Sequence, residues 1–255
     1  MSRRLVVTVV VSLVLAGCAS SVERQEDLQK RHQRADTHVM LGASYLQRGQ
    51  LEVANEEIKK ALAEEPDNSQ ANNMMAVLQW RLKNYDQADR LFRKSINNDP
   101  KNSSARHNYG AFLCEQGRLD DGIGQFEQAI KDPLYPYTAD VYLNAGVCEM
   151  KKPAPAAAEK YFREALRINP KMPAALYQMA KLSFDLGRTL SARGFMQRYF
   201  QEAGETPEAL LLAVRIEHAL GNKNAEASYA LLLRNKFPDS AEAAQLASIG
   251  TSRKK

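Results

Sequence analysis

The sequence predicts an all-α fold, a right-handed α-solenoid built from six copies of one helical hairpin. Small, aromatic and proline residues recur along the chain with a period of about 34 residues. The chain is also rich in alanine, a strong helix former, and it lacks the alternating apolar pattern of a strand. A generic helical bundle is the alternative, but matches recurring at the same positions of several copies favour the solenoid.

The first eighteen residues have the pattern of an export signal. Arg3 and Arg4 precede an apolar stretch of about eleven residues, which is too short to span a bilayer. It ends in Leu15–Cys18 (Leu-Ala-Gly-Cys), which resembles the lipobox of bacterial lipoproteins, whose cysteine thiol is acylated before cleavage. We therefore expect residues 1–17 to be a cleaved signal peptide and Cys18 to carry the lipid. A conventional signal with an incidental cysteine is the alternative.

The residues directly after Cys18 indicate the membrane in which the lipidated protein is expected to reside. In the lipoproteins that this ending resembles, aspartate directly after the lipidated cysteine is associated with retention in the inner membrane, and here Ala19 and Ser20 follow. The resemblance therefore implies the inner leaflet of the outer membrane, facing the periplasm. Two or more acyl chains hold a protein stably on a bilayer, so N-acyl and S-diacylglycerol groups on Cys18 would form a lasting anchor.

The charge balance and the motifs exclude several function classes. The chain has 35 Lys and Arg against 30 Asp and Glu, a net charge of +5, but two of these basic residues lie in the expected signal peptide. The remaining charges alternate in sign along helical faces, as in solvated helices, so we expect no nucleic-acid partner. The sequence contains no phosphate-binding loop, metal-binding histidine pair or serine nucleophile motif. We therefore expect no enzyme activity, small-molecule substrate, metal or further cofactor.

The rest of the chain divides by its repeat pattern. Residues 18–34 are mostly polar and are expected to form the lipidated tether and the start of the first helix. The predicted copies span residues 35–68, 69–102, 103–136, 139–172, 173–206 and 207–240. A capping helix to residue 247 and a frayed basic tail at 248–255 are expected to follow. A shift of two residues before the fourth copy falls in Asp132–Pro136 and predicts a longer turn there.

The residue types at fixed positions of each copy resemble the tetratricopeptide repeat. Glycine or alanine at the eighth position and alanine at the twentieth, as in Gly42 and Ala54, let the two helices of a hairpin approach closely. A large residue at the twenty-fourth position, such as Phe92, fills the space between neighbouring hairpins. Proline near the thirty-second, such as Pro66, ends the second helix. The later copies match less well, as terminal repeats do.

The first helix of each copy is expected to line a concave surface for a protein partner. Proteins of this repeat type bind ligands along positions two, five, nine, twelve and thirteen, and here these positions are largely apolar. We therefore expect a hydrophobic or extended ligand segment. The candidate contacts are Val39, Leu46, Val77, Trp80, Leu143, Val147, Met150, Tyr177 and Phe184. Trp80, the only tryptophan, fits both a groove anchor and a core residue.

Cys114 and Cys148 remain once Cys18 is acylated. They lie in the first helices of adjacent copies, and a disulfide between them is conceivable in the oxidising periplasm. Helix axes pack about 8–10 Å apart, whereas a disulfide needs Cα atoms within about 7 Å. The sequence therefore favours two buried free thiols.

Four features together resemble the PilF/PilW family of type IV pilus biogenesis lipoproteins. They are the lipobox with six repeats, the segment Asn108–Gly117, the insert Asp132–Pro136 and the segment Arg234–Ser240. The resemblance covers essentially the whole chain, and Pro153 departs from it where the fourth copy would carry its inter-helix glycine.

This resemblance implies a pilotin required for type IV pilus biogenesis and twitching motility. Such an outer-membrane lipoprotein binds subunits of the secretin PilQ and promotes their outer-membrane localisation and multimerisation. The alternative is another lipidated repeat scaffold, which serves outer-membrane protein assembly or recruits a periplasmic protease or cell-wall enzyme.

Overall fold

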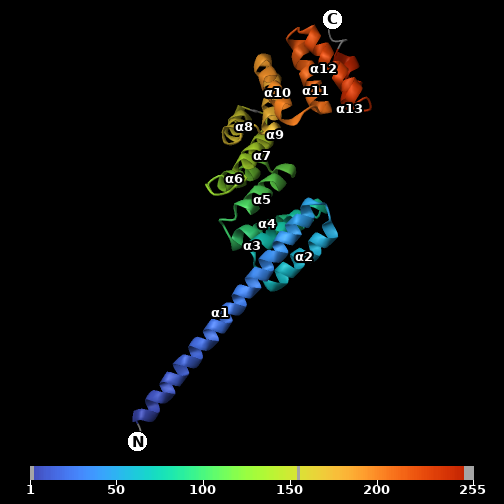
Figure 1. Cartoon of the computed structure of the whole chain (residues 1–255). Helices are drawn as coiled ribbons and strands as arrows, with labels where there is room; N and C mark the ends of the chain where they lie inside the picture. The colour runs from blue at the N-terminus through green and yellow to red at the C-terminus, as the bar shows by residue number, and fades with distance from the viewer. Residues whose placement is uncertain (1–2, 154–155, 250–255) are drawn as a thin grey trace. The chain divides into compact units, whose positions relative to one another are not determined.

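The computed structural model describes the backbone of residues 3–153 and 156–249, and the side chains of residues 24–153 and 156–246 (Figure 1). Every regular element in these ranges is an α-helix, so the predicted all-α class is confirmed. In chain order the helices are α1 (Arg3–Gln47), α2 (Leu51–Glu64), α3 (Ser69–Arg81), α4 (Tyr85–Asn98), α5 (Ser103–Glu115), α6 (Leu119–Ala129), α7 (Thr138–Glu149), α8 (Ala156–Ile168), α9 (Pro173–Asp185), α10 (Thr189–Ala203), α11 (Pro207–Ala219), α12 (Lys223–Lys236) and α13 (Ala241–Ile249).

The chain divides into two compact units, Met1–Phe112 and Leu113–Lys255, with the boundary inside α5. In the first unit α1 packs on α2 and α3 on α4. In the second unit α7 packs on α8, α9 on α10 and α11 on α12. Successive helices therefore pair as antiparallel hairpins joined by short turns.

Close packing within a hairpin depends on glycine facing a large side chain. A Cβ atom added to Gly42 would lie 2.6 Å from Cγ1 of Ile58, and one added to Gly146 would lie 2.4 Å from Cε1 of Phe162. Both large residues are fully buried. The eighth and twenty-fourth positions of a copy therefore interlock across its own hairpin. The large residue also packs against the next hairpin, as the sequence predicted, because Phe162 clusters with Met179 and Leu182 of α9.

The turns inside the hairpins repeat one left-handed backbone conformation. It occurs at four glycines with φ between +72° and +78°, which are Gly49, Gly117, Gly187 and Gly221. Lys83 takes the corresponding place in the second hairpin and has φ of +62°. Pro153 stands there in the fourth copy, and because its ring fixes φ near −65° that turn cannot follow the common form. The next two residues, 154 and 155, lie outside the described part.

The C-terminal helix covers the end of the second unit. Leu246 of α13 packs in one cluster with Leu210, Leu211 and Val214 of α11 and with Leu233 of α12. These side chains are buried, so α13 removes from solvent an apolar face that the last hairpin presents. The predicted basic tail began at residue 248, but α13 continues to Ile249, and residues 250–255 of that tail lie outside the described residues.

The first helix is longer than its hairpin. α1 runs from Arg3 to Gln47 and extends well beyond α2 (Figure 1). The side chains of residues 1–23, including Cys18, lie outside the described part, so the lipid-attachment prediction remains one from sequence. Among the described residues, no helix has both the length and the hydrophobicity needed to cross a membrane.

Replacing Gly146 tests the interlock. Gly146→Ala should lower the free energy of unfolding by about 1–3 kcal/mol, because the new methyl group overlaps the buried ring of Phe162. Gly194→Ala is the matched control, since no atom lies within 4 Å of its added Cβ. In the interior of α10 that change should raise stability by about 0.5–1 kcal/mol. Equal effects in urea denaturation would contradict the interlock.

Candidate partner-binding surface

The structure removes two candidates from the surface. Val39 is 6% exposed and Leu46 is 3% exposed, and both belong to the core cluster of the first hairpins. Their cover comes partly from Met75 and Leu78 of α3, which packs on α1. Val39 and Leu46 therefore stabilise the stacking of two hairpins and do not line an open groove.

Trp80 belongs to an aromatic cluster of the first unit. Its indole meets Phe92 and Phe112 edge-on, with ring centroids 6.5 and 5.8 Å away. Tyr109 stacks on Phe92 at 5.4 Å. These contacts join α3, α4 and α5, and Trp80 remains half-buried. Its ring packing therefore favours the core interpretation, although part of the side chain stays accessible together with half-buried Val77.

A hydrogen-bonded group closes the edge of this cluster. The Tyr109 hydroxyl donates to Oδ1 of Asp89 at 2.8 Å and accepts from Nε of Arg93 at 3.1 Å. Arg93 also lies 2.8 Å from Asp89. Burial, together with the hydrogen bond to the Asp89 carboxylate, raises the pKa of the Tyr109 phenol. The neutral phenol therefore links α4 to α5.

The second unit carries an apolar strip formed by Leu143 and Val147 of α7, by Met150 directly after α7, and by Tyr177 and Phe184 of α9, which we call the α7–α9 strip. All five side chains are half-buried. The α7 members pack against the cluster that contains Phe162. The Tyr177 ring lies 5.8 Å from that of Tyr199, and burial raises the pKa of Tyr177. The strip is thus supported from beneath and keeps an accessible apolar surface.

The sequence reasoning missed two exposed apolar side chains in the turn between α6 and α7. Leu134 is 88% exposed and Tyr137 is 58% exposed in the turn between α6 and α7. Their signal was present, because both lie beside the prolines of the predicted longer turn. A leucine between helices and next to prolines has no hairpin face to pack against.

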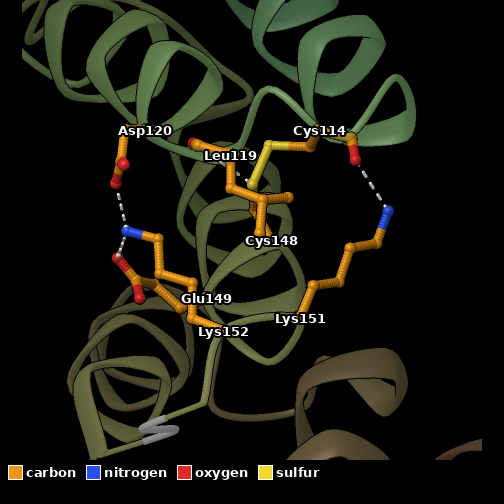
Figure 2. The surroundings of a disulfide bond; sticks show 7 residues. All are labelled: Cys114, Leu119, Asp120, Cys148, Glu149, Lys151 and Lys152. Atoms are coloured by element: carbon orange, nitrogen blue, oxygen red, sulfur yellow. Dashed lines mark hydrogen bonds and ion pairs between the residues drawn. A yellow bond between two sulfur atoms is a disulfide. The ribbon is translucent and has the colours of Figure 1, made fainter.

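Cys114 and Cys148 form a disulfide with Cα atoms 5.7 Å apart (Figure 2). The preference for free thiols was therefore wrong. Helix axes about 8–10 Å apart still allow facing Cα atoms to meet, because each Cα lies about 2.3 Å from its own axis. The axis spacing that argued against the bond was the wrong distance to compare.

Lysine side chains reinforce the junction around the disulfide (Figure 2). Lys151 donates from Nζ to the carbonyl oxygen of Cys114 at 2.9 Å, which satisfies a carbonyl in the last turn of α5. Lys152 lies 2.6 Å from Asp120 and 3.2 Å from Glu149, and the hydrogen bond to Asp120 raises its pKa. The disulfide sulfur of Cys148 carries no proton and makes only a contact, 3.6 Å from the Leu119 carbonyl oxygen.

The described part of the chain shows no group of three or more His, Cys, Asp or Glu residues placed to hold a metal. The described residues instead form half-buried apolar surface along the first helices of the hairpins. Core packing and a disulfide hold this surface rigid. Such surface suits the burial of apolar side chains from another protein.

Comparisons with known proteins agree with this architecture. Models of the tetratricopeptide repeat match residues 45–94, 91–131, 113–173 and 150–216. The type IV pilus assembly protein PilF of Pseudomonas aeruginosa is 30% identical over 244 residues, which are 95% of this chain and 97% of that protein. These repeat matches confirm the predicted fold class.

Two solved structures also match. One, from work on the function of Pseudomonas aeruginosa PilF, has a TM-score of 0.79 at 31% identity and covers 86% of this chain and 99% of that chain. The other, a crystal structure of the type IV pilus biogenesis factor PilW, has a TM-score of 0.77 at 28% identity, with coverage of 84% and 98%.

The packing of Trp80 predicts a stability effect. Trp80→Ala should lower the free energy of unfolding by about 2–3 kcal/mol, below the range for a fully buried aromatic because Trp80 is half-buried. Trp80→Phe keeps an aromatic ring beside Phe92 and Phe112 and should cost less than about 1.5 kcal/mol. Urea denaturation followed by circular dichroism measures both. An unchanged midpoint for Trp80→Ala would show that the ring is free of the core.

Removing the disulfide should lower the stability more than Trp80→Ala does. The bond closes a sequence separation of 34 residues, so the Cys114→Ala/Cys148→Ala variant should lose about 4 kcal/mol of stability through the freer unfolded chain. Thermal unfolding by circular dichroism compares it with the oxidised protein. Thiol titration of unfolded, unreduced protein in a Cys18→Ser background should find no free cysteine, and two free thiols would contradict the bond.

Proposed function

Because this chain belongs to the PilF/PilW family of tetratricopeptide-repeat proteins, we propose that it acts in type IV pilus biogenesis as a pilotin. In this role it is an outer-membrane lipoprotein that binds subunits of the secretin PilQ and promotes their localisation and multimerisation. The observation that carries the proposal is similarity to PilF over 97% of that protein's length. A shared repeat alone would match only part of the chain and would point to no particular process.

Two features support placement on the periplasmic face of the outer membrane. The first is Cys18 at the end of a lipobox-like sequence, followed by Ala19. The second is the Cys114–Cys148 disulfide, because such bonds form and persist in oxidising compartments such as the periplasm. The disulfide is independent of the signal sequence, so both the leader and the folded chain support export.

We propose two separate contact surfaces for the secretin, one in each unit. The second unit offers the α7–α9 strip, and the first unit offers Val77 and the accessible part of Trp80. A hydrophobic or extended secretin segment would bury these half-exposed apolar groups. The protein acts by binding and needs no catalytic residue. Anchoring it to the membrane where the secretin assembles raises the effective concentration of the two partners.

Removing the lipid tests the mechanism. In Cys18→Ala cells, outer-membrane secretin multimers and twitching motility should fall strongly, while the purified repeats should unfold at the parental temperature, since residue 18 precedes the first hairpin. Ser20→Ala is the matched control and should behave like the parent. Normal multimers in Cys18→Ala cells would remove lipidation from the mechanism.

Identifying the bound partner distinguishes the proposed pilotin function from the alternative, in which the protein is a lipidated scaffold for another process. Crosslinking in intact outer membranes, followed by purification of this protein, should recover the secretin. Recovery of barrel-assembly, protease or cell-wall enzymes without secretin would favour the alternative role.

A further inference from the structure

A group of basic side chains binds α1 to the end of α2 outside the repeat packing. Arg34 donates from Nε and Nη2 to the two carboxylate oxygens of Glu64, each at 2.9 Å. Arg31 donates to the backbone carbonyl oxygen of Glu64, and its Nε lies 3.8 Å from the carboxylate. Both arginines precede Ala35, the first fully buried residue of the hairpin. The contacts therefore hold the part of α1 that extends beyond the first repeat.

His32 adds a third contact one residue from Arg31. Its Nδ1 lies 3.0 Å from Oε1 of Glu65, and its Nε2 lies 3.4 Å from Asp36. The hydrogen bond to Glu65, helped by the charge of Asp36, raises the pKa of His32. We call these three basic side chains with Glu64 and Glu65 the N-terminal clamp.

The clamp is placed where a cation is most favourable. Glu64 is the last residue of α2, where unpaired carbonyl groups give the helix end a partial negative charge. Arg31 satisfies one of these carbonyls, and Arg34 meets the Glu64 carboxylate with two parallel hydrogen bonds. A single exposed ion pair contributes little to stability. Here two arginines bind the same residue, because Arg34 contacts the Glu64 carboxylate and Arg31 its backbone carbonyl.

The preceding segment is suited to propagate a helix from this clamp. An isolated helix of about a dozen residues is marginal in water, so residues 24–34 alone would fray. Glu26 and Lys30 stand four residues apart, as do Asp27 and Arg31, with the acid first in each pair. That spacing and order stabilise a helix. The clamp fixes one end of the segment, and each further turn then adds to an existing helix.

We propose that residues 24–34 form a rigid strut whose direction from the first hairpin is fixed by the N-terminal clamp. The consequence for the cell rests on the proposed lipid anchor. With α1 helical from residue 18 to residue 35, the anchor would stand about 25 Å along the axis from the hairpin. A flexible linker would allow similar reach in any direction. The strut instead restricts how the first unit is presented to the membrane.

Spin labels test the strut directly. Cysteines replacing Gln29 and Lys59, both exposed and both in the first unit, carry the labels in a chain that begins at residue 18, with Cys18→Ser and the disulfide intact. Pulsed electron resonance should give one narrow distance in this protein. Glu64→Gln/Glu65→Gln should broaden it and should speed amide exchange at residues 24–34 about fivefold.

A matched variant controls for the loss of charge. Glu52→Gln/Glu56→Gln removes two exposed acids from the same helix, α2, and should leave the distance and the exchange unchanged. A broad distance in the parent protein would overturn the strut. A narrow distance that survives Glu64→Gln/Glu65→Gln would overturn the clamp as its cause.

The measurement uses neither lipid nor secretin, so it separates the strut from the proposed function. A narrow distance together with recovery of no secretin in the crosslinking experiment would reject the pilotin and keep the strut. A broad distance together with lost multimers would keep the pilotin and reject the strut.

Discussion

Each hairpin depends on how closely its two helices approach, and small residues set that distance. At Gly146 the missing side chain makes room for the fully buried ring of Phe162, and at Gly42 it makes room for Ile58. If those positions carried larger residues, the helices would separate and the neighbouring hairpin would lose its packing surface. The low aromatic share of 7% follows from this arrangement, because much of the interface is alanine and glycine against one large residue.

Stacking of these hairpins determines which apolar residues remain accessible. In the first unit α3 covers Val39 and Leu46, so those first-helix positions become core. Farther along, Val147 and Phe184 stay half-buried because the neighbouring first helices cover only part of them. The same face of the first helix is therefore buried in the core near the start of the chain and remains partly accessible farther along it. A binding surface made this way is rigid, since the residues that would contact a partner also pack on the core beneath.

The sequence was sufficient wherever a feature depends on residues close in the chain. The glycine turns and the close approach of the helices at small residues lie within one hairpin, so their spacing predicts them. The contact of Gly146 with Phe162 across the hairpin was not predicted. The disulfide was misjudged because sequence position does not tell which Cα atoms of two helices face each other. The clamp was invisible for a related reason. Arg34 and Glu64 are 30 residues apart, and each looks like part of an ordinary solvated helix.

A rigid binding surface and a rigid N-terminal segment lower the cost of binding for the same physical reason. Binding costs free energy for every flexible group that becomes ordered. A surface that is already rigid before binding loses less conformational entropy, so it binds more tightly. The Cys114–Cys148 bond and the core beneath the α7–α9 strip provide that order for a partner. The N-terminal clamp would provide it for the proposed lipid anchor. An anchor that limits orientation as well as distance raises the effective concentration only for partners approaching the first unit from the allowed side.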